Sequence, residues 1–273
     1  MLPYFCHTKS ITMNLDLSGK RAMVCGSTQG IGRAAAEELA LLGAEVILVA
    51  RNEDKLKAEV ATLPSNGANH SYLSADFSNP SALKKVIDGF VSNEKSVHIL
   101  VNNTGGPAGG LAIDAELEQF RMAFNQHLIA NQILAQALVP GMKENGYGRI
   151  INIISTSVKA PLNGLGVSNT IRGAVGNWSK TLANELGQFN ITVNNVLPGA
   201  TNTARLQSIA DNKSAKTGQS ADEIVAGMAA AVPMKRIAQP EEVANAVAFL
   251  ASPAASYING INVPVDGGRT PCL

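Results

Sequence analysis

This sequence contains few cysteines and few aromatic residues, and neither positive nor negative charge is in excess. The 273 residues include three cysteines, and no spacing among them matches a zinc site or a CxxC redox pair. Lys and Arg (22) nearly balance Asp and Glu (21), which argues against nucleic-acid or membrane partners, because these require clustered positive charge. We therefore predict no metal site, reduced thiols and a cytoplasmic location.

Long apolar runs are also missing. No stretch reaches the roughly 18 apolar residues of a transmembrane helix. The first twelve residues lack the apolar core of a signal peptide and stand outside the pattern that begins near Met13. We predict that residues 1–12 are a disordered extension. Residues 13–273 are predicted to form one domain, because no linker rich in Pro, Gly or Ser interrupts them.

Short apolar runs alternate with helical patterns along the rest of the chain. The runs at 46–50 and 150–154 are apolar without strict alternation, which is typical of strands covered on both faces. Strands separated by helices imply right-handed crossovers and a parallel sheet. The sequence therefore predicts an α/β fold with a doubly wound (Rossmann) sheet of about seven strands in a single domain. The predicted strands are 21–25, 45–50, 70–74, 97–101, 149–154, 191–196 and 262–265, and the predicted helices 30–42, 53–63, 81–91, 117–143, 166–188 and 240–251.

A glycine-rich segment follows the first predicted strand and opens the first predicted helix. Its glycines are Gly26, Gly30 and Gly32. Glycines permit a tight turn and let the backbone approach a pyrophosphate, while the helix N-terminus supplies free N–H groups. The alternative is a turn without a ligand. The position inside a βαβ unit favours a dinucleotide site.

The end of the second predicted strand carries Arg51, where a chain that binds NAD usually has Asp or Glu. A guanidinium group suits a 2′-phosphate and has no use for a bare ribose hydroxyl. We therefore predict NADP as the cofactor. NAD is the less favoured alternative, which the nearby Glu53 keeps open, and Arg51 as a solvated charge or stacked on adenine is a further alternative.

Together with motifs elsewhere, this segment resembles the short-chain dehydrogenase/reductase family in its single-domain form, with a motif context similar to 3-oxoacyl carrier-protein reductases. The resemblance runs from about residue 14 to 268 and includes an Asn-Asn-Thr-Gly motif in which Thr replaces the usual Ala. It implies cofactor contacts through the glycine loop and through motifs after four further strands. The implied cofactor-binding residues are Gly26, Ser27, Gln29, Gly30, Ile31, Gly32, Arg51, Asp76, Phe77, Asn103, Thr104, Gly105, Arg172, Pro198, Gly199, Thr201 and Thr203.

The resemblance also implies a catalytic set of Asn, Ser, Tyr and Lys, and here the chain departs from it. Asn125 and Ser155 match the Asn and Ser positions. Thirteen residues after Ser155, where Tyr is usual, stands Ser168, and four residues later Arg172 replaces Lys. None of the four tyrosines has Lys or Arg four residues later. We predict Asn125, Ser155, Ser168 and Arg172 as the catalytic residues.

The replacement changes the chemistry that the site can perform. A phenol has a pKa of about 10, which a neighbouring Lys lowers, whereas an aliphatic hydroxyl is a far weaker acid. Arg172 stays cationic and has five donors with which to hold the ribose. Three interpretations remain open: a carbonyl reductase that uses another proton donor, a nucleotide-binding sensor without redox turnover, and an inactive scaffold subunit. The intact cofactor motifs favour the first two.

Two further features concern the substrate and the assembly. The segment at about 203–232 is rich in Ala, Ser and Lys and predicts a mobile lid over a small-molecule substrate. The resemblance implies a homotetramer or homodimer built on the helices at about 117–143 and 166–188. His127 follows Asn125 by two residues, so we expect it on another side of the helix, in a structural or surface role.

Overall fold

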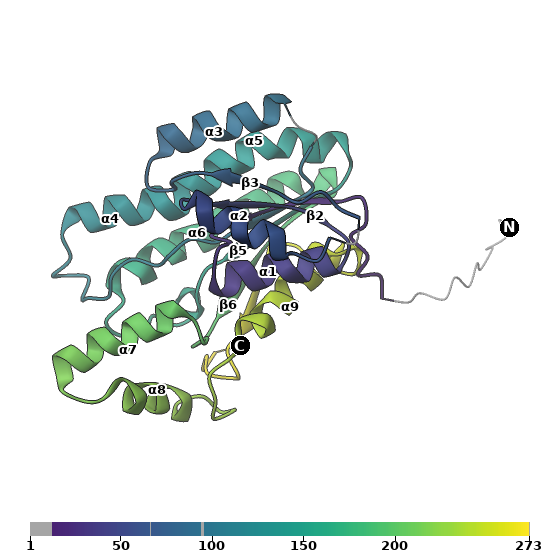
Figure 1. Cartoon of the computed structure of the whole chain (residues 1–273). Helices are drawn as coiled ribbons and strands as arrows, with labels where there is room; N and C mark the ends of the chain where they lie inside the picture. Colours follow the sequence, from purple (N-terminus) through teal and green to yellow (C-terminus); the bar gives the residue numbers. More distant parts are fainter. Residues whose placement is uncertain (1–12, 66, 94–95, 273) are drawn as a thin grey trace, which may run out of the picture.

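A computed structural model describes residues 13–65, 67–93 and 96–272, so the predicted disordered extension lies outside the described residues. Within them the strands form one parallel sheet in the order β3-β2-β1-β4-β5-β6-β7 (Figure 1). The order reverses between β1 and β4, as a doubly wound fold requires. The predicted fold class is confirmed. The strands are β1 (Arg21–Cys25), β2 (Glu45–Ala50), β3 (Ser71–Ser74), β4 (Ile99–Asn102), β5 (Gly148–Ile153), β6 (Ile191–Pro198) and β7 (Asn262–Val265).

Helices cover both faces of the sheet (Figure 1). Alternate residues of one strand enter opposite clusters: Val24 packs with one group of helices and Met23 with the other. Both faces are therefore buried, which explains why the strands read as unbroken apolar runs. The first face carries α1 (Gly30–Leu41), α2 (Glu53–Thr62) and α9 (Pro240–Ala251), and the second α3 (Pro80–Asn93), α5 (Ala130–Glu144) and α6 (Gly166–Leu186).

The long helix predicted at 117–143 is interrupted. The structure has α4 (Leu117–Phe124), a π-helical turn (Asn125–Ile129) and then α5. A π turn inserts an extra residue per turn, which a 3.6-residue period does not predict, and such turns are frequent at functional sites. The other predicted boundaries differ from the observed ones by at most two residues.

The segment predicted as a lid contains two helices, α7 (Ala204–Thr217) and α8 (Ala221–Ala230), which lie side by side (Figure 1). The side chains of Thr203 and Ser220 cap their N-termini. Gly218 ends α7 in the left-handed region, with φ 76°. The motion of this segment stays a prediction. Among the residues described, no helix is both long and apolar enough to cross a bilayer.

Candidate active site

The segment that joins β1 to the first turn of α1 leaves no room for side chains at two of its glycines. Gly26 has a φ of 59°, and a β-carbon there would lie 2.6 Å from the carbonyl oxygen of Asn103. A β-carbon on Gly32 would overlap the carbonyl oxygen of Gly26. The Asn103 amide donates to the carbonyl groups of Cys25 and Gly26, both at 3.3 Å. The end of β4 thus holds the loop in the shape that exposes the start of α1.

The N-terminus of α1 keeps its backbone donors free. Gln29 occupies the N-cap without a side-chain cap bond, and the first turn has no acidic residue. The Ser27 hydroxyl is buried and has no hydrogen-bond partner within the described part of the chain. Ile31 packs partly buried against the core. Free N–H groups at a helix N-terminus bind phosphate, so the loop fits the pyrophosphate of a dinucleotide.

Arg51 and Asp76 lie together at the carboxyl ends of β2 and β3. The Ser74 hydroxyl donates to the Arg51 carbonyl at 3.2 Å. Burial opposes ionisation of Asp76, but hydrogen bonds from Ser78 and the charge of Arg51 outweigh it and lower the pKa of that carboxyl. Arg51 itself is exposed. The Phe77 ring is buried in the core, and its predicted adenine contact stays a prediction.

Glu53, which kept NAD open as an alternative, binds two neighbouring side chains of the protein. Its carboxylate lies 2.9 Å from the Lys57 ammonium and accepts a hydrogen bond from the Tyr72 hydroxyl at 3.2 Å. The hydrogen bond and charge of Lys57, together with the Tyr72 bond, lower the pKa of Glu53. This carboxylate is turned toward α2 and β3, which favours Arg51 as the residue beside the ribose.

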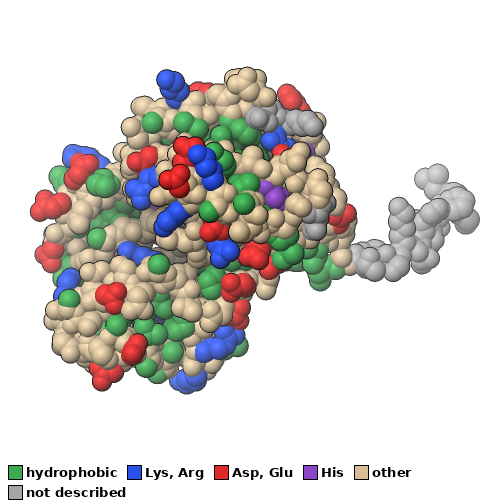
Figure 2. Space-filling model, in the orientation of Figure 1, with side chains coloured by type: hydrophobic (Ala, Val, Ile, Leu, Met, Phe, Trp, Pro, Cys, Tyr) green, Lys and Arg blue, Asp and Glu red, His purple; other side chains and the backbone are tan. Residues whose placement is uncertain are grey.

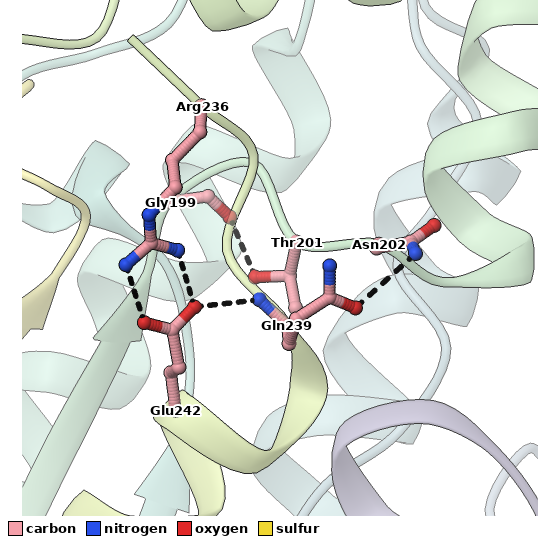
Figure 3. A network of polar contacts seen from close by, with 6 residues as sticks. All are labelled: Gly199, Thr201, Asn202, Arg236, Gln239 and Glu242. Atoms are coloured by element: carbon pink, nitrogen blue, oxygen red, sulfur yellow. Dashed lines mark hydrogen bonds and ion pairs between the residues drawn. The ribbon is translucent and has the colours of Figure 1, made fainter. Parts of the chain in front are cut away.

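The loop after β6 is tied to the start of α9 (Figure 3). The Thr201 hydroxyl donates to the Gly199 carbonyl at 3.2 Å, and the Asn202 amide donates to the Gln239 side chain at 3.2 Å. The next residue, Thr203, has its methyl group 3.1 Å from the position that a β-carbon on Gly30 would occupy. The predicted nicotinamide loop therefore faces the glycine loop across a narrow gap.

An ion pair completes this network (Figure 3). Arg236 donates twice to Glu242, at 2.6 Å each, and the Gln239 backbone donates to the same carboxylate at 2.8 Å. The Arg236 and Gln239 hydrogen bonds lower the pKa of Glu242 to about 2. The carboxylate therefore remains charged at neutral pH and fixes the N-terminus of α9.

Helix α6 carries Ser168 and Arg172, two of the four predicted catalytic residues. It packs against the turn that follows Ser155 and against the π turn that Asn125 begins. Arg172 is 8% exposed and donates from Nη1 to the Ile153 carbonyl at 2.9 Å, at the end of β5. The Ser155 hydroxyl accepts from the Ser157 backbone at 3.1 Å. Ser168 lies half-buried in the first turn of α6.

His127 is buried beside Thr104 and near Arg172, which fits the structural role expected as one alternative and not the surface role. It is 2% exposed rather than on the surface, its Nδ1 is hydrogen-bonded to the Thr104 hydroxyl, and its Nε2 is buried without a partner in the residues described. Burial and the charge of Arg172 lower the pKa of His127 to about 2, so it is neutral at pH 7. Thr104 in place of the family's usual Ala was the one signal for this pair.

No tyrosine in the described residues replaces the missing phenol. The Tyr72 hydroxyl donates to Glu53, and the Tyr147 hydroxyl donates to the Ala251 carbonyl at 2.6 Å. Tyr257 is fully exposed. The departure at Ser168 is therefore not compensated by a tyrosine from these positions.

Metal chemistry and nucleophilic chemistry at Cys25 find no support in the described ranges. No group of three or more His, Cys, Asp or Glu side chains there is placed to hold a metal ion. Cys25 is buried in the core, and burial raises the pKa of its thiol to about 12, so it is not a nucleophile at neutral pH.

Comparison with known proteins places this site in a family. A family model described as enoyl-(acyl carrier protein) reductase matches residues 26–270. The chain is 33% identical over 256 residues to a 3-oxoacyl-(acyl-carrier-protein) reductase of Vibrio cholerae, covering 93% of this chain and 98% of that protein. It is 32% identical over 255 residues to 7alpha-hydroxysteroid dehydrogenase of Escherichia coli, covering 93% and 96%.

Solved structures of similar fold are also reductases. L-sorbose reductase from Gluconobacter frateurii, complexed with NADPH and L-sorbose, has a TM-score of 0.89 and 34% identity, covering 96% of this chain and 100% of that one. An F189W variant of actinorhodin polyketide ketoreductase with NADPH has a TM-score of 0.86 and 30% identity, covering 93% and 98%. This chain belongs to the short-chain dehydrogenase/reductase family, in its single-domain form.

The neutral His127 predicts a stability that depends on pH. Its pKa is about 2 in the folded protein, whereas an unfolded histidine has a pKa of about 6.5. The unfolded state therefore binds more protons between these values, and the free energy of unfolding falls as the pH falls below about 6.5. At a rate of about 1.4 kcal/mol per pH unit, the loss reaches about 2–3 kcal/mol near pH 4.5.

His127→Gln is expected to remove most of this loss, since the amide does not titrate. Urea unfolding of both proteins at neutral pH and near pH 4.5 measures the difference. Gln126→Ala, on the same π turn, is the control and should keep the wild-type pH dependence. An unchanged pH dependence in His127→Gln would show that the imidazole is not held neutral.

Proposed function

We propose that this protein is an NADP-dependent oxidoreductase that acts on a carbonyl or alcohol group of a small molecule. The main support is the glycine loop, which Asn103 clamps against β4 and which faces Thr203, with Arg51 at the end of the next strand. Family membership and the NADPH named in two similar structures add to it. The nicotinamide supplies or accepts the hydride.

Different groups of the predicted residues bind different parts of the dinucleotide. The N–H groups at the start of α1 bind the pyrophosphate, and Arg51 binds the 2′-phosphate. Asp76 and Phe77 border the adenine, and the segment from Pro198 to Thr203 borders the nicotinamide. The charge of Arg172, buried at the end of β5, holds the ribose side of the site.

The chain's own residues then act on the substrate. Ser155 and Ser168 donate hydrogen bonds to the substrate oxygen, and Asn125 supports the π turn beside them. Neither serine is an acid near neutral pH, and His127 is not one either, because its pKa of about 2 leaves it as the neutral imidazole there. The proton therefore comes through water or from the substrate, and turnover is slow compared with an enzyme that has a positioned acid.

Arg51→Ala tests the choice of NADP. Loss of hydrogen bonds to a charged group costs about 1.5–3 kcal/mol, so the Kd for NADPH should rise roughly 10- to 150-fold. The Kd for NADH should stay within about twofold, because NADH has no 2′-phosphate. Calorimetric titration of each coenzyme measures both values. Lys57→Ala, which removes a charge already paired with Glu53, is the control; if it matches Arg51→Ala, Arg51 has no special role.

A nucleotide-binding sensor without redox turnover is the second candidate function. The observation that favours it is Ser168 at the position where the family usually has Tyr. Tight NADPH binding without NADPH oxidation on any carbonyl compound would support it. Absence of binding would favour the scaffold interpretation instead.

We also infer a homodimer or homotetramer. Large apolar side chains on and beside α4 are exposed, with Ile113 at 89%, Leu117 at 70% and Met122 at 50%. An exposed apolar surface of this kind is typical of an interface. The lid role of 203–232 and the cytoplasmic location stay predictions.

A further inference from the structure

Two arginines from distant parts of the chain meet beside Gly106, in the loop that follows β4. The position that a β-carbon on Gly106 would occupy lies 3.7 Å from Nη2 of Arg205 and 4.0 Å from Nη2 of Arg172. Arg205 comes from the first turn of α7 and Arg172 from α6. Because glycine has no side chain, no β-carbon fills the point that both guanidinium groups approach.

Neither guanidinium has an acidic partner. Among the described residues, no Asp or Glu forms an ion pair with Arg172 or Arg205. Burial and the charge of Arg205 lower the pKa of Arg172 to about 10, and burial lowers the pKa of Arg205. Two partly desolvated charges of the same sign repel, and an unpaired buried charge is costly. An anion between them would offset that cost.

Each guanidinium is held in place and keeps donors free. Arg172 uses Nη1 for the Ile153 carbonyl, and Arg205 uses Nη2 for the Pro107 carbonyl. A guanidinium has five N–H donors, so several remain for a ligand. Two fixed guanidinium groups suit the paired oxygens of a carboxylate.

The location connects this pair with the substrate. Ile153 ends β5, two residues before Ser155, and Arg172 lies close enough to His127 to lower the pKa of that imidazole. The surface is hollowed between the lobe of α7 and α8 and the rest of the molecule, with basic side chains at the edge of the hollow (Figure 2). The glycine loop and Arg51, which would bind the phosphates, follow β1 and β2.

We propose that Arg172 and Arg205 bind the carboxylate of the substrate, that the remaining N–H donors of Arg172 serve the ribose, and that the substrate is therefore an oxo acid or the corresponding hydroxy acid. This inference rests on the proposed function, because it places the acid in the same site. Arg205 is the specificity-determining residue, since it reaches the anion from α7 and is not itself one of the predicted catalytic residues.

Binding of oxo acids and their uncharged esters tests the proposal. Acetoacetate, levulinate and their methyl esters are titrated by calorimetry into the protein with NADP⁺, a combination that permits no hydride transfer to the ketone. At least one acid should bind, its methyl ester should bind at least about tenfold more weakly, and affinity for the acid should fall as salt is raised. Arg205→Gln should weaken binding of the acid about tenfold or more and leave the affinity for the ester unchanged.

Two further variants and one coenzyme measurement define the outcomes. Arg205→Lys keeps the charge and should recover part of the affinity for the acid, whereas Arg121→Gln, an exposed arginine on α4, should behave as wild type. Equal binding of acids and esters, or equal effects of Arg205→Gln and Arg121→Gln, would overturn the proposal. The proposal would also be overturned if Arg205→Gln lost as much affinity for NADP⁺ as for the acid, because the anion that Arg205 binds would then be a phosphate of the coenzyme.

The two proposals fail separately. If acids bind through Arg205 but no NADPH is oxidised, the carboxylate site stands and the redox function is wrong. If uncharged ketones are reduced and the acids show no preference, the redox function stands and the carboxylate site is wrong.

Discussion

Gly32→Ala is expected to abolish dinucleotide binding, with the Kd for NADPH raised at least roughly 100-fold. A β-carbon at this position would overlap the Gly26 carbonyl oxygen and lie 2.6 Å from the Asn103 amide nitrogen. The first obstacle is backbone and the second is the side chain that clamps the loop, so neither gives way without moving the α1 donors. Overpacking of this kind costs about 1–3 kcal/mol, and displaced N–H groups add a loss of phosphate binding.

Gly89→Ala is the matched control for this substitution. Gly89 is exposed inside α3, and a β-carbon there would meet nothing within 4 Å. Alanine should stabilise the helix by about 0.5–1 kcal/mol and leave NADPH affinity unchanged. Thermal unfolding and calorimetry on both variants separate a folding defect from a binding defect. Wild-type NADPH affinity in Gly32→Ala would show that the loop is not the pyrophosphate site.

The double variant Ser168→Tyr with Arg172→Lys is expected to raise carbonyl reduction roughly 10²- to 10⁴-fold, the range that a positioned general acid contributes. A phenol beside an ammonium group has a lowered pKa and transfers a proton that an aliphatic hydroxyl holds too tightly. Ser168 and Arg172 are four residues apart on α6, so both side chains extend from one face of the helix. NADPH oxidation with a panel of carbonyl compounds measures the gain.

Ser168→Phe with Arg172→Lys is the control, because it supplies the ring without the hydroxyl. It should show no gain over the wild type. If the Tyr variant is as inactive as the Phe variant on every carbonyl compound, a reductase site hidden by the missing acid is contradicted. The sensor interpretation then gains support, provided that NADPH still binds.

The sheet could be predicted because its strands are buried on both faces and read as unbroken apolar runs. β1, β2 and β7 have the predicted bounds. The glycine loop could be placed because its glycines follow β1 directly, and the structure gives a steric reason for Gly26 and Gly32.

The surroundings of His127 and Arg205 depend on contacts between distant segments, which a pattern along the chain does not contain. The π turn changes the angular spacing after Asn125, so the spacing along the chain left open whether His127 is buried or on the surface. Arg205 was noted only as part of a segment predicted to move. Its role became visible because α7 brings it to Pro107, 98 residues earlier in the chain.

Calorimetric titration of the purified protein with NADPH and with NADH tests the central claim most directly. We predict that NADPH binds at least about tenfold more tightly than NADH, because only NADPH carries a 2′-phosphate for Arg51. Equal affinities for the two coenzymes, or no heat of binding from either at millimolar concentration, would contradict a site built for a phosphorylated dinucleotide.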